Sequence, residues 1–572
     1  MTKDELIENQ KVERASCSEA IKNSTAPKKV IVAGAGTGKT FTFKELLRSN
    51  GSSNNLAMTF INMLADDMQR SFGDIAEVKT FHAYCKRILH AKNGKVTLIP
   101  FLTKIIEQDA QALGVDSVGF EDRFQTLDET TGQIAFYLER GDYYDAVSFN
   151  DSVFRLYKLL CSEPEIVPDF QQIVIDEFQD FNALEVAFIK QLEQKGNILI
   201  VGDDDQAVYA GRNASPTFLR ELCESGEYEA FELPFCSRCT EVIVESTNAF
   251  MESAEKNGHM LGRRQKRYEC FVASKDEESE KYPKVVTATC SVGSVVVKYV
   301  ESVIDSISAD EIAQSWKEGE EYPTVLIIGP KHYLAAINKE LAGKFPQMVL
   351  KTSSEIDFSI LDGYELLLDE PNSNLGWRIL GGLLLDLATG KRLIEDSRAG
   401  SPIRDLLDVK FVTDHEIVLD FIKFLAEGPE IDAELEAGIR NIVGDEYEAL
   451  LEKYLPKKEE EKVEPDKSQP SILLTSFVGC KGLSAGHVII VGANNGSIPK
   501  DPNKIDDVEI AQFMVALTRT RKQCHIVSNK WLVAPYGKGG AYNPPFTRTE
   551  FLGWIPNELI EDKGELSAKS FK

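Results

Sequence analysis

The sequence predicts an α/β chain with two parallel-sheet units, each interrupted by a mainly helical segment. Strand-like runs alternate with helical patterns from Val30 to Arg70 and again from Ile173 to Leu219, the order of elements that produces a parallel sheet. A second region of this kind begins near Val285, and residues 324–328 (TVLII) are its clearest strand. A glycine-rich turn at 33–40 joins a strand-like run to a helix-like one.

The two inserts are expected where helical patterns carry no strand signal of similar strength. Residues 86–165 form the first such stretch, and residues 361–455 form the second. The charged run 457–467, which contains proline, is typical of a solvated linker, and strand patterns resume at 472–474 and 488–491. The expected units are 1–85 with 166–228 for the first sheet, 86–165 for its insert, 229–360 with 470–572 for the second sheet, and 361–469 for the second insert with its linker.

Composition sets limits on the function. The formal net charge of −27 over 572 residues disfavours indiscriminate binding to nucleic acid, although a local basic groove stays open. We find no signal peptide and no apolar run that could span a bilayer, so we expect a cytoplasmic protein without a membrane partner. Ten cysteines without regular spacing indicate reduced thiols.

The glycine-rich turn matches the phosphate-binding loop A-x-x-x-x-G-K-T. It comprises Ala33, Gly34, Ala35, Gly36, Thr37, Gly38, Lys39 and Thr40, and Phe41 follows it directly. In such a loop the backbone N–H groups surround the phosphates, the lysine reaches the β and γ oxygens, and the threonine hydroxyl ligates Mg²⁺. Because the turn lies between a strand and a helix, we expect all nine residues to contact ATP.

An acidic motif follows the β-branched, strand-like run 173–175. Asp176 and Glu177 come directly after this strand, where the first carboxylate would hold Mg²⁺ together with Thr40 and the second would polarise the attacking water. Taken alone, such a pair is more often the N-terminus of a helix, where acids are favoured by the helix dipole. Its position one domain length after a phosphate-binding loop favours the catalytic interpretation.

Residues 176–180 (DEFQD) resemble motif II of the UvrD/Rep/PcrA-like superfamily 1A DNA helicases, and the other motifs of that family follow in order. The matching segments are 56–62 (motif Ia), 80–82 (T-F-H), 201–209 (motif III), 233–238 (motif IV), 480–483 (motif V), 515–519 (motif VI) and 546–552. The resemblance spans residues 30–555. It implies two RecA-like domains, each with a helical insert, and ATP with Mg²⁺ bound between the domains.

The resemblance also assigns roles around the γ-phosphate. Gln206 would sense it, while Arg238 and Arg519 would neutralise it from the second domain, with Lys481 and Gly482 beside the nucleotide. The alternative for Arg519 is a surface arginine in the run Arg519-Thr-Arg521. Gln10 is the candidate for reading adenine, although a solvated helical glutamine is the competing interpretation.

DNA contacts are implied in three of the motifs. The candidates are Thr59, Phe60, Asn62, Thr80, Phe81, His82 and Tyr209. Aromatic side chains stack on bases in single-strand binding, but they are more often part of a core. The basic cluster 263–267 (RRQKR) is either part of a phosphate track or an exposed loop.

Three departures from the family pattern concern DNA coupling more than hydrolysis. Motif III continues Tyr209-Ala-Gly-Arg212 without the usual tryptophan, motif V lacks its histidine and glutamate, and Phe41 replaces a common arginine. The C-x-x-C at 236–239 lacks a second cysteine pair, so we expect no zinc site there.

The sequence thus predicts an ATP-dependent translocase or helicase acting on single-stranded or tailed DNA, with 3′-to-5′ polarity implied by the family. The alternative is a DNA- or nucleotide-sensing ATPase subunit that partners a separate nuclease, of the kind found in phage-defence systems such as Gabija. A non-enzymatic ATP-binding clamp is disfavoured by the presence of Lys39, Glu177 and Arg519.

Overall fold

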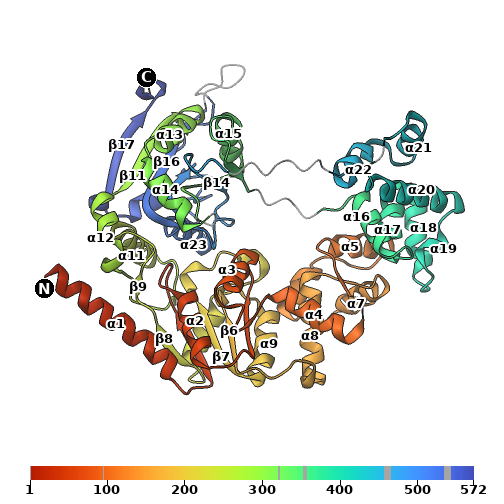
Figure 1. Ribbon diagram of the computed structural model, residues 1–572, viewed down its shortest axis with the longest axis horizontal. Helices are drawn as coiled ribbons and strands as arrows, with labels where there is room; N and C mark the ends of the chain where they lie inside the picture. The colour runs from red at the N-terminus through yellow and green to blue at the C-terminus, as the bar shows by residue number, and fades with distance from the viewer. Residues whose placement is uncertain are drawn as a thin grey trace. The chain divides into compact units, whose positions relative to one another are not determined.

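The computed structural model describes residues 2–94, 96–319, 322–351, 357–428, 430–456, 465–533 and 543–571. Most of the expected linker at 457–467 lies outside these residues. The chain forms two compact units, of which the first comprises Met1–Phe81, Pro168–Ser353 and Pro465–Lys572, and the second comprises His82–Val167 and Ser354–Glu464. Figure 1 shows that the first unit contains both sheets and that the second is built mainly of helices.

The first sheet has six parallel strands. Across the sheet these are β3 (Glu77–Thr80), β2 (Asn55–Thr59), β6 (Gln172–Ile175), β7 (Asn197–Gly202), β1 (Lys28–Val32) and β8 (Glu229–Glu232). Its helices are α1 (Lys3–Asn23), α2 (Lys39–Ser49), α3 (Asn62–Phe72), α9 (Ala183–Leu192) and α10 (Thr217–Glu224). The central strands β2 and β6 are buried along their whole length, as in a sheet covered on both faces.

This topology positions the candidate site. Strand β7 pairs with both β1 and β6, so the carboxyl ends of the three strands lie side by side at one edge of the sheet. The phosphate-binding loop follows β1, the DEFQD motif follows β6 and motif III follows β7. Ligands of open α/β sheets bind at this edge.

The second sheet has seven parallel strands. In order they are β13 (Met348–Leu350), β14 (Ile472–Thr475), β12 (Val325–Ile328), β15 (Ala485–Val491), β16 (Thr520–Trp531), β11 (Val285–Val292) and β17 (Ile560–Leu566). Its helices are α11 (Glu241–Lys256), α12 (Val272–Lys281), α13 (Gly293–Asp305), α14 (Ala309–Glu318), α15 (Lys331–Leu341) and α23 (Asp507–Leu517). A short parallel pair, β9 (Phe235–Cys236) and β10 (Glu269–Cys270), carries motif IV.

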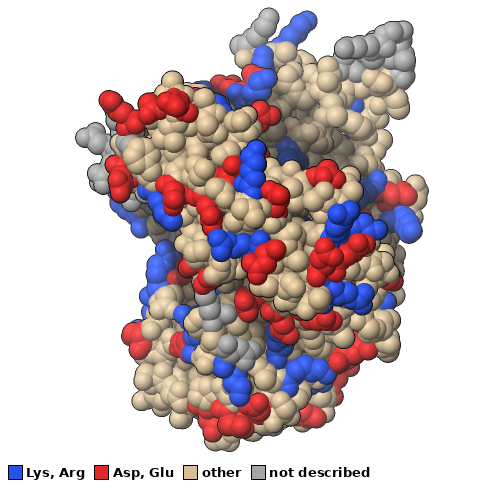
Figure 2. All heavy atoms as spheres, turned by 90° about the vertical axis from the view of Figure 1, so that its right-hand side faces the viewer, with Lys and Arg blue, Asp and Glu red and all other residues tan. Residues whose placement is uncertain are grey.

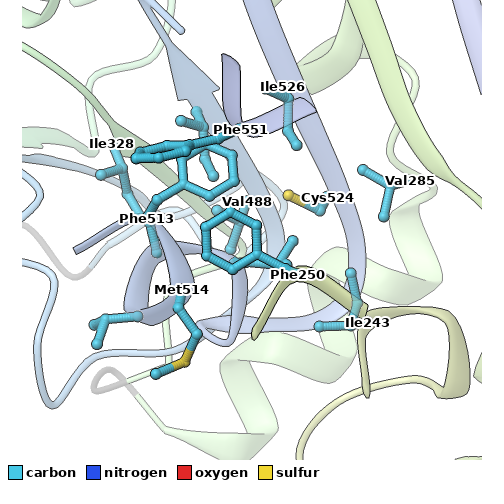
Figure 3. Close-up of a cluster of buried hydrophobic side chains, with 14 of the residues drawn as sticks. Ile243, Phe250, Val285, Ile328, Val488, Phe513, Met514, Cys524, Ile526 and Phe551 are labelled. Atoms are coloured by element: carbon cyan, nitrogen blue, oxygen red, sulfur yellow. The ribbon is translucent and has the colours of Figure 1, made fainter. Parts of the chain in front are cut away.

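A large apolar core holds α11 and α23 against the second sheet. In Figure 3, Phe250 of α11 faces Phe513 of α23 and Phe551, and their rings pack with centroids 5.2–5.5 Å apart. Val488, Cys524 and Ile526 of the sheet complete the cluster, and all are fully buried. Helix α23 ends in motif VI, so this core fixes the position of Arg519.

The prediction of an α/β chain with two parallel sheets is confirmed, but one expected boundary is wrong. Residues 229–232 were expected in the second unit, whereas β8 pairs with β1 as the edge strand of the first sheet. The four residues of this strand, EAFE, do not alternate between apolar and polar side chains as a half-buried strand would. Only Phe231 packs against the core of the first sheet. Backbone pairing with β1 therefore places this strand.

The two helical segments form a single unit rather than two separate appendages. Its helices are α4 (Phe81–Asn93), α5 (Leu102–Ala112), α6 (Phe120–Thr126), α7 (Gln133–Tyr143), α8 (Phe149–Ser162), α16 (Ile360–Asp369), α17 (Asn374–Leu384), α18 (Leu387–Ser397), α19 (Ile403–Leu406), α20 (Val409–Leu425), α21 (Ala433–Val443) and α22 (Tyr447–Tyr454). The short strands β4 (Thr97–Leu98) and β5 (Ala146–Val147) pair within it.

A buried ion network joins the two segments of the helical unit. The Asp109 carboxylate of α5 is fully buried and accepts from Arg140 Nη2 of α7 at 2.7 Å. The Tyr144 hydroxyl donates to the same oxygen, Oδ2, at 2.5 Å, and the other oxygen, Oδ1, accepts from Arg378 Nε of α17 at 2.8 Å. Because a buried charge needs compensating partners, this network fixes how α5 and α17 pack.

The molecular surface carries both signs of charge. Figure 2 shows one face on which Lys and Arg side chains are interspersed with Asp and Glu side chains rather than gathered into one basic surface. Among the helices of the described residues, none combines the length and the apolar character that a bilayer crossing requires.

Candidate nucleotide site

The phosphate-binding loop has the geometry that its glycines allow. Gly36 and Gly38 have φ values of +72° and +93°, in the left-handed region that favours glycine. A Cβ at Gly36 would collide with the Cβ of Arg238, so glycine is also needed for the close approach of motif IV. The loop ends where α2 begins at Lys39, which directs the positive end of the helix toward the loop.

A cavity of about 290 Å³ lies above this loop. Its walls come from both sheets: Ala35, Gly36, Thr37, Gly38, Lys39, Thr40, Leu64, Asp176, Glu177 and Gln206 on one side, and Ser237, Arg238, Tyr322, Gly482, Ser484, Arg519 and Arg521 on the other. The structure thus brings together the expected catalytic residues. The other expected nucleotide contacts that do not line the cavity are Gln10, Ala33, Gly34, Phe41 and Lys481.

Two carboxylates occupy the floor of the cavity in different electrostatic environments. Glu177 lies 3.8 Å from Lys39 Nζ and 3.3 Å from Lys481 Nζ, and the Gln179 amide donates to it at 2.6 Å. Although burial opposes ionisation, these partners hold the pKa of Glu177 well below its usual range. Burial, and then the charge of Glu177, raise the pKa of Asp176 to about 7.

The donor set fits a magnesium ion. Asp176 supplies a buried carboxylate and Thr40 a hydroxyl in the same cavity, and hard oxygen ligands of this kind are what Mg²⁺ prefers. A divalent cation would stabilise the ionised form of Asp176 against the burial that raises its pKa. When bound, the ion would neutralise charge on the phosphates.

The backbone of Glu177 adopts an unusual conformation. Its φ of 56° and ψ of 41° place a non-glycine residue in the left-handed region. This conformation costs about 1–2 kcal/mol for an ordinary L-residue. The turn directs the Glu177 carboxylate to Lys39 and Lys481 immediately after β6.

Two cations of the second sheet reach the first sheet at the cavity. Arg519 is buried, and its Nη2 donates to Gln206 Oε1 at 3.3 Å while its Nε donates to the Val515 carbonyl at 2.9 Å. The alternative of a surface arginine is therefore wrong. Burial, and then repulsion from Arg238, lower the pKa of Arg519, so an anion between the two guanidinium groups would be stabilised.

Lys481 connects motif V to the DEFQD motif. Its fully buried ammonium pairs with Asp180 and donates to the Gln206 carbonyl at 2.8 Å. Lys481 also lies 3.3 Å from a carboxylate oxygen of Glu177, and its expected contact with the nucleotide stays a prediction. The K-G-L pattern indicated an important lysine but not its partner.

Gln10 is neither solvated nor free. Its side chain is buried, and its amide nitrogen donates to the Cys270 carbonyl at 3.1 Å while its oxygen accepts from the Val272 N–H at 3.0 Å. The interpretation as a solvated helical glutamine is wrong. Its expected contact with adenine stays a prediction, as does that of Phe41, whose side chain is exposed.

The expected DNA-contacting residues differ strongly in exposure. Phe81 is fully buried among aromatic rings, with centroid distances of 5.0 Å to Phe181 and 5.5 Å to Phe188, so its expected role as a base platform is corrected to a core position. Thr59 is also fully buried. Tyr209 is half-buried, with Lys481 Nζ 5.7 Å from its ring centroid.

The remaining residues that were expected to contact DNA lie in both compact units. Phe60 is half-buried, with the Arg212 guanidinium over its ring at 4.8 Å, and Thr80 is likewise partly exposed at the end of β3. His82 belongs to the helical unit, where its ring meets Phe149 at 4.8 Å. The side chain of Asn62 lies outside what the structure describes.

The basic cluster at 263–267 is only partly the exposed loop that its charge suggested, and its role in a phosphate track stays a prediction. Arg263 and Lys266 are buried in ion pairs with the acidic run after β7, and Arg267 pairs with Glu13 and Glu269. Sequence analysis missed this pairing, although the complementary runs 203–205 (DDD) and 263–267 were both visible. It also missed Tyr322 and Arg521, which line the cavity without any motif to mark them.

Fold and site together define a P-loop protein of the RecA-like class, with the loop in one sheet domain and arginines supplied by a second. A family model described as "AAA domain" matches residues 17–212. The chain is 30% identical over 247 residues to the ATP-dependent DNA helicase PcrA of Staphylococcus aureus, covering 34% of this chain and 34% of that protein.

DNA helicase II of Escherichia coli is 27% identical over 286 residues, covering 41% of this chain and 39% of the relative. DNA helicase II of Salmonella typhimurium is 26% identical over the same length. The matches span roughly a third to two fifths of these curated relatives. They confirm the resemblance to the UvrD/Rep/PcrA-like helicases that the ordered motifs predicted.

Proposed function

We propose that this chain hydrolyses ATP with Mg²⁺ and uses the energy to translocate along single-stranded DNA, separating tailed duplexes. The observation that carries this proposal is the cavity where Lys39 and Glu177 of one sheet domain meet Arg238 and Arg519 of another. A nucleotide between two such domains would close or release them as it turns over. The similarity to proteins named as DNA helicases supports DNA as the polymer.

In this proposal each group has a definite task. Backbone N–H groups of the loop and Lys39 would hold the phosphates, with Mg²⁺ on Thr40 and Asp176 neutralising charge. Glu177, kept ionised by its lysine neighbours, would accept the proton of the attacking water. Arg238 and Arg519 would stabilise the charge on the transferred phosphoryl group, and a 3′-to-5′ direction belongs to the proposal through the family resemblance alone.

The proposal is tested with Lys39→Ala and Glu177→Gln. We expect each variant to lower DNA-stimulated ATP turnover by about 10²–10³-fold, because each removes a group aimed at the developing charge or the attacking water. Arg48→Ala is the matched control, since Arg48 is exposed on the same helix α2. Normal turnover by either variant would overturn the ATPase assignment.

A second candidate function is a DNA- or nucleotide-sensing ATPase that works with a separate nuclease. It is favoured by the internal pairing of Arg263 and Lys266, which takes two cations of the most basic run of the sequence away from any DNA track. Release of a labelled strand from a 3′-tailed duplex decides between the two functions. Efficient unwinding by the isolated chain supports the helicase, whereas ATP turnover without strand release supports the sensor.

A further inference from the structure

An acidic run of three residues is enclosed directly beside the nucleotide cavity. Asp203, Asp204 and Asp205 follow β7, and each is at most 2% exposed. Three adjacent buried carboxylates repel one another strongly unless cations compensate them. Arg220 of α10 compensates Asp204, and the other cations come from the connection between α11 and β10, which lies more than fifty residues further along the chain.

Lys266 is the central cation of this arrangement. Its ammonium, on a side chain only 6% exposed, donates to Asp203 Oδ1 and, at 2.5 Å, to Asp205 Oδ2. Arg263 forms a two-point contact with Asp205 at 2.7 and 2.6 Å. Asp204 accepts from Arg220 Nε at 2.9 Å and from the backbone N–H of Arg264 at 2.7 Å.

The other oxygen of Asp203 faces the hydrolytic site. Asp203 Oδ2 accepts from Gln206 Nε2 at 2.6 Å, which fixes the orientation of the Gln206 amide. With its nitrogen held in this way, Gln206 presents its Oε1 to Arg519 Nη2 at 3.3 Å. A continuous series of contacts therefore runs from Lys266 through Asp203 and Gln206 to Arg519.

The electrostatics agree with this geometry. Burial alone would lower the pKa of Lys266, but the surrounding carboxylates raise this pKa above its usual range. The side chain is therefore charged. Lys266 also belongs to the second-sheet side of the cavity, because the flanking Met260 and Tyr268 pack in the core of that sheet. Movement of that sheet would carry the ammonium with it.

We propose that Lys266 is a positioning residue for ATP hydrolysis, which acts by fixing the Asp203 carboxylate so that Gln206 is oriented toward Arg519 and the γ-phosphate. This inference rests on the proposed ATPase function and deepens it. Lys266 does not line the cavity, so it acts through Asp203 rather than on the nucleotide. The role requires a cation at this place, not the lysine itself.

The test compares Lys266→Met, Lys266→Arg and the control Arg267→Met in the full chain. Lys266→Met is expected to lower kcat for ATP by about 10- to 100-fold, since misplacing a catalytic group slightly has effects of that size. The KM for ATP should change by less than about threefold, because the ground-state contacts of the loop are intact. Lys266→Arg should recover most of kcat, and Arg267→Met, which alters a half-exposed pair, should leave it unchanged.

Two further measurements separate this inference from folding defects and from the proposed function. The double variant Asp203→Asn/Lys266→Met removes a buried anion together with the cation, and it should melt near the wild-type temperature while its kcat stays low. Calorimetric titration with ADP–aluminium fluoride should show about 10- to 100-fold weaker binding by Lys266→Met, with ADP affinity unchanged.

The outcomes are distinct. An inert wild type would refute the proposed function alone, because the analogue titration still measures the effect of Lys266. A Lys266→Met protein with normal kcat and normal analogue binding would overturn the inference. So would an arginine variant no better than methionine, with kcat and melting temperature falling together, because that pattern indicates a structural role only.

Discussion

Phe81 and Tyr209 both stand in motifs that imply DNA contact, yet their environments differ. Phe81 is fully enclosed by Phe60, Phe181 and Phe188, so its ring has no face to offer to a base. Tyr209 keeps part of its ring accessible, and the Lys481 ammonium lies 5.7 Å from the ring centroid. Substitutions at these two positions should therefore affect different properties.

For Tyr209→Ala we expect weaker binding to single-stranded DNA, by about 1–3 kcal/mol if one base stacks on the ring. Basal ATP turnover should change less than DNA affinity. Fluorescence anisotropy with a labelled oligonucleotide measures the first quantity, and ATP turnover without DNA measures the second. Equal losses in both would argue against a stacking role.

Phe81→Ala serves as the contrasting variant in the same experiment. It should lower the free energy of unfolding by about 3–5 kcal/mol, the usual cost of removing a buried phenyl ring. Its thermal unfolding temperature should fall, in contrast to that of Tyr209→Ala.

The site residues that could be predicted stand in local motifs after a strand, whereas the contacts that could not be predicted join residues far apart in the chain. Lys39, Thr40, Asp176 and Glu177 are marked by local spacing after a strand, and the structure brings them into one cavity. The pairing of Lys266 with Asp203 depends on residues 63 positions apart, and no local pattern specifies which acid a lysine will meet. The cluster 263–267 was therefore interpreted from its charge alone, and this charge suggested either an exposed loop or contact with DNA phosphates.

Among the elements, strands with continuous apolar runs were predictable and an edge strand was not. Residues 324–328 and 472–474 are continuous apolar runs or nearly so, and both form buried internal strands of the second sheet, β12 and β14. Strand β8 has two glutamates and one phenylalanine in four residues, because an edge strand is largely exposed. Its place in the first sheet comes from hydrogen bonds to β1, which leave little trace in the sequence.

The helical unit depends on one carboxylate for the junction of its two segments. Asp109→Ala would leave the Arg140 and Arg378 guanidinium groups buried without a counter-ion, and breaking such a network costs about 3–5 kcal/mol. We expect a lower melting temperature and faster proteolysis within the helical unit. Asp420→Ala, which breaks an exposed pair with Lys423 in the same unit, should cost less than about 1 kcal/mol. Equal effects of the two substitutions would contradict the role of Asp109.

For the whole molecule, the net charge of −27 and the mixture of acidic and basic side chains on the face in Figure 2 disfavour an extended basic track for DNA phosphates. We expect single-strand affinity to fall about tenfold or less between roughly 50 and 200 mM salt, as for two or three phosphate contacts. Binding titrations over this range give the slope directly. A loss of about a thousandfold would instead reveal an extended basic track.

The interleaving of the two units also has a consequence for how the protein is made. Asp109 and Arg140 leave the ribosome long before Arg378, which lies 269 residues after Asp109. Domains generally fold as units during synthesis. In the first helical segment of this protein, however, Asp109 has no contact with Arg378 until most of the chain has been translated. The first sheet likewise has its loop early and its edge strand β8 much later. We therefore expect the helical unit to complete its buried ion network only after Arg378 has been translated.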